Sequence, residues 1–221
     1  MTSKKITHIV WDWNGTLLDD VGLTVDVLNA RLLQKKLPPL TLKQFRERFH
    51  FPVNDFYRSI GFKTAQEQEE EMYEWFVEYE QRKQSCSLHD QVEALLLATK
   101  ERGVTSSILS AHQYESIIES LKQYEILDQF KFVVGSTPGL RGISKLECGE
   151  KLCLDLKNLH GIEREKIALI GDSTHDWEVA TALGLQCVLV SNGVMNADRL
   201  VKHGVPVASS LTEALQTIKV L

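Results

Sequence analysis

The chain is 221 residues long, with 43% hydrophobic and 25% charged residues, which are ordinary values for a globular protein. This length allows a sizeable core, in one large domain or in one domain that carries an insertion. The formal net charge of −5 leaves no basic footprint, so neither nucleic acid nor an anionic membrane is an expected partner.

The N-terminus and the cysteines both favour a cytoplasmic location. No apolar stretch near the N-terminus is long enough for a signal peptide, and no window of the sequence approaches the length of a membrane span. The four cysteines show no CxxC spacing, and three of them lie in apolar-periodic segments. We therefore expect buried thiols rather than disulfides or zinc ligands.

Short β-type runs recur along the chain and predict a parallel sheet. They lie at residues 6–11, 104–110, 130–135, 166–171, 186–190 and 205–209. From the second run onward, each gap to the next run holds a helix-period pattern or a short loop, and the helix after residue 173 is expected to end at Gly184. This alternation predicts an α/β fold, a Rossmann-like doubly wound parallel sheet with both faces covered.

The stretch from 19 to 87 interrupts that alternation, because it holds helical patterns and no convincing strand. Thr41 and Gln44 have the spacing of a capping box, which predicts a helix start. The run QEQEEE at 66–71 is interpreted as the solvated face of a helix. We therefore predict an α/β core formed by residues 1–18 and 88–221, with an all-helical cap at 19–87.

Polar side chains stand where several predicted strands end. Asp12 follows the first strand, Ser110 ends the second, and Asp172 follows the strand at 166–171, while Lys145 lies beyond the strand at 130–135. In a doubly wound sheet these ends meet at one edge, where ligands bind. Carboxylates, a hydroxyl and a lysine at one edge suit a phosphate and a divalent cation, and oxygen ligands favour Mg²⁺.

Four segments resemble, in order, the motifs of the haloacid dehalogenase superfamily, specifically its capped phosphatase branch that includes phosphoglycolate phosphatase. They are DWNGTLLDD, SSILSAH, the Lys145 segment GISKLECGEKL, and GDSTHD. The motif order, the position of the cap and the lengths between motifs agree over nearly the whole chain. The resemblance implies a Mg²⁺-dependent hydrolase that acts on a small phosphorylated metabolite, a phosphomonoester.

The resemblance also implies roles for individual residues. Asp12 would be the nucleophile that forms an aspartyl-phosphate, and Lys145 would offset charge on that carboxylate and on the phosphoryl group. The expected phosphate contacts are Ser110, Ala111, Lys145, the backbone around Trp13 and Gly15, and Thr16, which orders the loop. The expected metal ligands are Asp12, the backbone carbonyl of Asn14, Asp172 and Asp176.

Some assignments keep an alternative. Lys151 competes with Lys145, and the family often has proline after its lysine where this chain has Leu146. Asp176 also completes a capping box with Ser173, and both interpretations of this residue can hold together. His112 and His175 lie near the same edge, but single histidines in such places are more often solvated or packed than catalytic.

Asn14 is the departure that matters most. It occupies the position of the family's second aspartate, which protonates the leaving alcohol and then activates water. An amide does not titrate near neutral pH, and general acid–base help is worth roughly 10²–10⁴-fold. The sequence therefore predicts a site that binds metal and phosphate but turns over slowly.

Three explanations of Asn14 remain open at this stage. The protein is a slow or leaving-group-limited phosphatase, a non-catalytic or regulatory protein that binds a phosphorylated ligand, or a chain in which this residue is an engineered trap. A dinucleotide oxidoreductase is excluded because no GxGxxG follows the first strand. The sequence indicates neither the phosphomonoester nor the oligomeric state, although Arg46, Arg48, His50 and Arg58 are conceivable substrate contacts from the cap.

Overall fold

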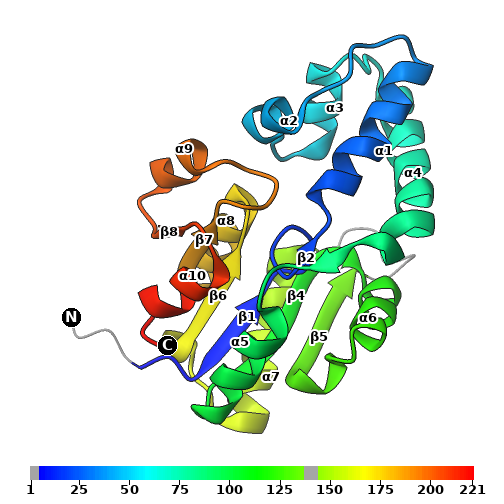
Figure 1. Ribbon diagram of the computed structural model, residues 1–221. Helices are drawn as coiled ribbons and strands as arrows, with labels where there is room; N and C mark the ends of the chain where they lie inside the picture. Colours follow the sequence, from blue (N-terminus) through cyan, green and yellow to red (C-terminus); the bar gives the residue numbers. More distant parts are fainter. Residues whose placement is uncertain (1–4, 137–143) are drawn as a thin grey trace.

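The computed structural model describes residues 5–136 and 144–221, and a six-stranded parallel sheet forms its centre (Figure 1). The strand order is β5-β4-β1-β6-β7-β8. The strands are β1 His8–Trp11, β4 Thr105–Gln113, β5 Phe130–Ser136, β6 Ile167–Gly171, β7 Gln186–Val190 and β8 Val207–Ala208. All six predicted strands are thus present, and β1 lies in the middle between β4 and β6.

Helices cover both faces of the sheet because side chains alternate along each strand. On β1, Ile9 and Trp11 belong to the larger hydrophobic core, whereas Val10 belongs to the core on the opposite face. The larger core is closed by α5 Val92–Glu101, α6 Tyr114–Gln123 and α10 Leu211–Thr217. The opposite one is closed by α7 Lys145–His160 and α8 Thr174–Leu183, and the short α9 Ala197–Leu200 lies beyond β7.

Between β1 and the rest of the sheet, the chain leaves the core and forms four helices that we call the cap. They are α1 Val21–Gln34, α2 Leu42–Arg48, α3 Val53–Ser59 and α4 Ala65–Arg82, and they rise above the carboxyl ends of the strands in Figure 1. Short strands flank the cap, β2 Leu18–Asp19 and β3 Ser87–Leu88, which pair antiparallel. The cap has its own apolar cluster, centred on Leu28, Phe45 and Phe56.

The helix α4 shows where the sequence pattern was only partly informative. Four of the six residues in QEQEEE are exposed, as predicted for a solvated face. The prediction is wrong for Gln68 and Glu71, whose side chains are buried. Gln68 donates to the Phe62 carbonyl, and Glu71 accepts from Arg31 of α1, so packing of α1 against α4 supplies partners that a single-helix pattern cannot reveal.

Local end signals agree with the observed helix limits. The capping box of Thr41 and Gln44 is present at the start of α2. Gly184 ends α8 with φ 69°, a left-handed conformation that glycine adopts without a side-chain clash. Within residues 5–136 and 144–221, no helix combines the length and the apolar character needed to cross a membrane.

Candidate active site

Three buried carboxylates gather at the carboxyl end of the central strands. Asp12 follows β1 and its backbone N–H donates to the Ile170 carbonyl of β6, which fixes the start of the loop (2.9 Å). Asp172 follows β6, and Asp176 lies in the first turn of α8. One oxygen from each of the three carboxylates lies within 4.8 Å of the others. These residues were predicted to meet because parallel strands present their carboxyl ends on the same side.

Lys145 bridges two of these acids. It is the first residue of α7, directly after the N-cap Ser144, and its Nζ lies 2.9 Å from Asp12 Oδ1 and 2.6 Å from Asp176 Oδ1. Burial alone would lower the pKa of Lys145, but the charges of both carboxylates raise it above its usual range, so the amine stays protonated. The competing Lys151 is exposed on the same helix.

The carboxylates are electrostatically unequal. Burial raises the pKa of Asp12 to about 6, against the opposing effect of Lys145. Burial together with the charges of Asp176 and Asp12 raises the pKa of Asp172 well above its ordinary value. Three acids share one ammonium, so the fully ionised cluster carries an excess of negative charge that a divalent cation would balance. The donor set, made of oxygens alone, fits a hard cation.

Asp172 is held in place by the loops around it. The backbone N–H of Val194 donates to its Oδ2 at 2.6 Å, and Thr16 Oγ1 lies 3.4 Å from its Oδ1. A Cβ added to Gly15 or to Gly193 would collide with this carboxylate, and Gly15 also has a φ of +72°. Both glycines therefore allow the backbone to approach the acid closely.

Asn14 is engaged in a three-residue network. Its Nδ2 donates to Asp20 Oδ2 at 2.7 Å and to the Tyr79 hydroxyl at 2.8 Å, and that hydroxyl donates to the same Asp20 oxygen at 2.6 Å. Burial and the charge of Asp20 raise the pKa of Tyr79, so the phenol stays protonated. The Asn14 amide is therefore a hydrogen-bond donor to a buried carboxylate, and through Tyr79 the cap helix α4 contributes a side chain to the site.

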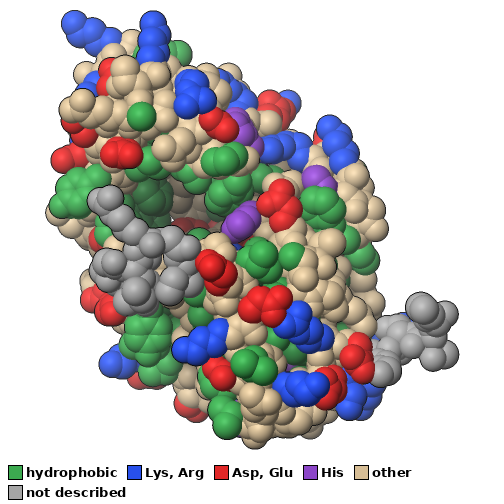
Figure 2. All heavy atoms as spheres, turned by 180° about the vertical axis from the view of Figure 1, so that it is seen from behind, with side chains coloured by type: hydrophobic (Ala, Val, Ile, Leu, Met, Phe, Trp, Pro, Cys, Tyr) green, Lys and Arg blue, Asp and Glu red, His purple; other side chains and the backbone are tan. Residues whose placement is uncertain are grey.

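A cavity of about 390 Å³ lies between the carboxylates and the cap. Figure 2 shows this face of the molecule hollowed, with hydrophobic side chains at the rim of the hollow. Of the residues predicted to contact phosphate, Ser110, Ala111 and Lys145 line the cavity. Trp13, Gly15 and Thr16 do not; the Trp13 ring is buried in the core, and the Gly15 N–H already donates to Asp20 Oδ1 at 2.8 Å.

The two histidines of the predicted edge line the cavity and have partners. His112 Nε2 lies 2.9 Å from Glu80 Oε1 of α4 and 2.9 Å from Ser116 Oγ, so it belongs to a contact between cap and core. The ring of His175 lies 5.0 Å from that of Phe51 in the loop between α2 and α3. Both positions suit packing at the boundary of cap and core.

Sequence reasoning missed Asp20, Tyr79 and Val194. Val194 could have been found by applying the strand-end rule to β7, since the SNGV segment follows it directly. Asp20 belongs to the segment DWNGTLLDD, but it accepts hydrogen bonds from Asn14 and Gly15 only because the loop after β1 folds back toward it. Tyr79 comes from the cap, far along the chain, and its sequence neighbourhood carries no signal for a role in the site.

Comparisons with known proteins agree with this geometry. The sequence model described as "Haloacid dehalogenase-like hydrolase" matches residues 9–190. The chain is 26% identical over 203 residues to tyrosine-protein kinase PtkA of Mycobacterium tuberculosis, which cover 91% of this chain and 67% of the kinase. It is 24% identical over 201 residues to phosphoglycolate phosphatase of Synechococcus elongatus, which cover 87% of each protein.

Solved structures show the same fold. A haloacid dehalogenase-like hydrolase from Streptococcus pneumoniae has a TM-score of 0.80 at 20% identity, with 99% of this chain and 100% of that chain covered. The structure of PtkA from M. tuberculosis has a TM-score of 0.79 at 23% identity, with 98% and 99% covered. These likenesses confirm the predicted Rossmann-like architecture.

Proposed function

The chain belongs to the haloacid dehalogenase-like hydrolase family, and on this premise we propose that it is a Mg²⁺-dependent phosphatase that cleaves small phosphomonoesters through an aspartyl-phosphate on Asp12. The resemblance drawn from its four sequence motifs is thereby confirmed at the level of the family. The substrate class, the metal, the covalent intermediate and the cytoplasmic location are our proposals.

The observation that carries the proposal is the position of Asp12. Its carboxylate lines the cavity at the end of the central strand, and Lys145 Nζ lies 2.9 Å away and holds positive charge beside it. A carboxylate so placed can attack phosphorus, and the lysine can stabilise charge that develops on the phosphoryl oxygens. Ser110 and Ala111, at the end of β4, line the same cavity and can donate to those oxygens.

The acids Asp12, Asp172 and Asp176, with the backbone carbonyl of Asn14, would hold Mg²⁺. When bound, the ion supplies charge neutralisation for an approaching phosphate dianion. The residues of the chain do the rest: Asp12 takes the phosphoryl group, and Thr16 and Val194 hold Asp172 in its orientation. Turnover is slow in this proposal because Asn14 cannot transfer a proton to the leaving group or from water.

Two of the similarities support a phosphoryl-transfer reaction. The curated names of the relatives are phosphoglycolate phosphatase and tyrosine-protein kinase. Both names denote transfer of a phosphoryl group, which is the reaction that a nucleophilic Asp12 beside a cation site would perform.

The test is an assay of p-nitrophenyl phosphate and acetyl phosphate hydrolysis with Mg²⁺ and with excess chelator, together with mass spectrometry of the acid-quenched protein. We expect Mg²⁺-dependent turnover and a phosphorylated peptide that contains Asp12. Lys145→Ala should abolish turnover, whereas Lys151→Ala on the exposed face of α7 should not change it. Tight phosphate binding without turnover or phospho-Asp12 would contradict the proposal and favour a regulatory binding protein.

A further inference from the structure

The cap side of the cavity has an unusual composition for a site that receives a small polar metabolite. Seven aromatic side chains line it from the cap: Phe45, Phe49, Phe51, Phe56, Tyr57, Trp75 and Phe76. Their rings already contact one another, for example Phe45 and Phe49 at a centroid distance of 5.0 Å, and Phe49 and Phe56 at 5.2 Å in an edge-on arrangement. A further ring could join this cluster with the geometries that aromatic side chains prefer.

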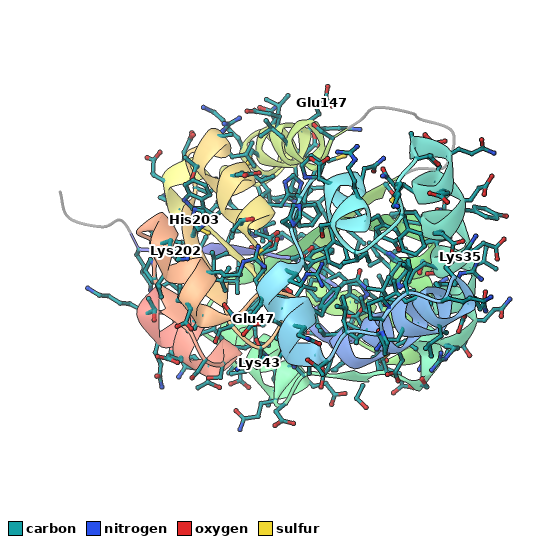
Figure 3. All side chains as sticks on the ribbon, turned by 90° about the horizontal axis from the view of Figure 1, so that it is seen from above. Lys35, Lys43, Glu47, Glu147, Lys202 and His203 are labelled. Atoms are coloured by element: carbon teal, nitrogen blue, oxygen red, sulfur yellow. The ribbon has the colours of Figure 1, made fainter. Side chains whose placement is uncertain are left out.

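The cap cations are engaged elsewhere. Arg46 Nε donates to the Gly193 carbonyl at 2.8 Å, and Arg58 pairs with Asp55 at 2.7 Å on the exposed surface. Lys43 and Glu47 of α2, labelled in Figure 3, have exposed side chains whose charged groups lie 3.9 Å apart. Among the described residues that line the cavity, Lys145 is the only lysine or arginine, and it is bound to Asp12 and Asp176. A charged leaving group would therefore lose its hydration without meeting a free lysine or arginine on the described wall of the cavity.

The amide of Asn14 adds an independent constraint on the leaving group. It is committed to Asp20 and Tyr79 and has no proton to give. Without a proton from this residue, we expect the departing oxygen to leave as an anion. A phenol has a pKa of about 10, whereas the pKa of an aliphatic alcohol, like that of water, is far higher, so phenolate departs far more readily.

We propose that this site takes aryl phosphates, the phosphomonoesters of small uncharged phenols; the inference rests on the proposed phosphatase function. Asp12 forms a bond to phosphorus while the bond from phosphorus to the aryl oxygen breaks. The electron pair leaves with that oxygen, and the phenolate takes a proton from water. Water then attacks phosphorus, the bond to Asp12 breaks, inorganic phosphate is released, and the proton of the attacking water passes to solvent.

The first experiment measures kcat/KM of the full chain with Mg²⁺ on four substrates. Phenyl phosphate is the aryl ester, benzyl phosphate keeps a ring but has an alkoxide leaving group, 2-phosphoglycolate is a small acid, and acetyl phosphate has a good leaving group without a ring. We expect kcat/KM for phenyl phosphate to be at least about 10-fold higher than for benzyl phosphate, and at least about 10²-fold higher than for 2-phosphoglycolate.

The outcomes separate this inference from the proposed function. If acetyl phosphate is hydrolysed and kcat/KM for 2-phosphoglycolate equals or exceeds that for phenyl phosphate, the inference of an aryl substrate is overturned while the phosphatase function stands. If kcat/KM is the same for benzyl phosphate and phenyl phosphate, the proposed dependence on the leaving group is overturned. If no substrate is turned over and Asp12 is never phosphorylated, the proposed function itself fails.

The second experiment tests the aromatic wall. Phe76 is half-buried, lines the cavity and lies 5.9 Å from the His112 ring, so Phe76→Ala should lower the ratio of phenyl to acetyl phosphate activity about 10-fold. Phe76→Leu should recover part of that ratio, since it restores apolar volume. Tyr73→Ala, an aromatic deletion on the exposed side of the same helix, is the matched control. An unchanged ratio in a folded Phe76→Ala protein, verified by its thermal unfolding, would overturn the assignment of this wall.

Discussion

The two sides of the cavity are built in opposite ways. The core side consists of charged groups at the ends of strands and at a helix start: Asp12 and Asp172 follow β1 and β6, Lys145 begins α7, and backbone and side-chain bonds fix all three. The cap side consists of aromatic rings on helices that pack against each other. In the proposed function this difference separates two tasks: the core side would supply the reactive groups, and the cap side would select the substrate.

Asp12→Asn should have the largest effect of any single change, because it removes the proposed nucleophile from the core side. We expect phosphatase turnover to fall at least about 10³-fold. The urea-unfolding midpoint should stay near that of the parent, since the amide can still accept from Lys145. Steady-state hydrolysis of p-nitrophenyl phosphate gives the measurement, and retained turnover would show that another residue carries the phosphoryl group.

Asn14→Asp should raise turnover about 10²-fold. The new carboxyl would face Asp20, whose Oδ2 now lies 2.7 Å from the Asn14 amide, and two acids at that distance share a proton. A group that keeps its proton near neutral pH is suited to protonate a leaving oxygen.

The rate gain of Asn14→Asp should be larger for benzyl phosphate than for phenyl phosphate, because only the alkoxide needs the proton. Asn14→Ala is the control, since it removes the amide without adding an acid. A gain in the alanine variant as well would mean that the amide itself hinders turnover.

On the cap side, Glu71→Gln should mainly affect stability. The buried Glu71 carboxylate joins α4 to α1, with Arg31 Nε at 2.8 Å and Lys35 Nζ at 2.9 Å. Loss of its charge leaves Arg31 poorly compensated and should lower the free energy of unfolding by about 2–3 kcal/mol. Urea denaturation measures this, and the exposed neighbour substitution Glu70→Gln should cost less than about 0.5 kcal/mol.

Glu80→Gln should have the smallest effect, and one that depends on pH. Burial alone would raise the pKa of Glu80, but hydrogen bonds from His112, Lys83 and Ser116 lower it to about 2. A depressed carboxyl pKa stabilises the folded state fully above the unfolded value, near 4.5, and this contribution fades as the pH falls toward 2.

We expect Glu80→Gln to cost about 1–2 kcal/mol at pH 7 and progressively less below pH 4.5. Denaturation at a series of pH values gives the measurement. A cost that stays constant from pH 7 to pH 3.5 would mean that packing, rather than charge, holds this end of α4 to the core.

The sequence predicted the core side of the site better than the cap side, for a physical reason. Apolar runs of β-branched residues mark the buried strands, and polar residues at their ends are brought together by topology alone, so Asp12, Ser110 and Asp172 could be placed without coordinates. The cap is positioned by packing between helices, which a pattern along one helix does not encode. Tyr79 and the inward acid Glu71 were therefore not foreseen.

The cap arginines show the same limit. Arg46 was a conceivable substrate contact, yet it donates to two carbonyls of the loop after β7, at Asn192 and Gly193. Its long side chain reaches the core from α2, so its position along the helix says little about where its charge lies. The strands β2 and β3 were also not predicted, because two residues are too short to show an alternating pattern.

Those two short strands have a consequence for how such a chain can change. Leu18 pairs with Leu88 and Asp19 with Ser87, so the two points where the chain leaves and re-enters the core lie side by side. A segment whose two ends lie side by side is a typical domain insertion, since another segment can be inserted at the same junction without altering the order of the strands. Substrate preference could then diversify by exchange of this segment, while Asp12, Lys145 and Asp172 of the core stay in place.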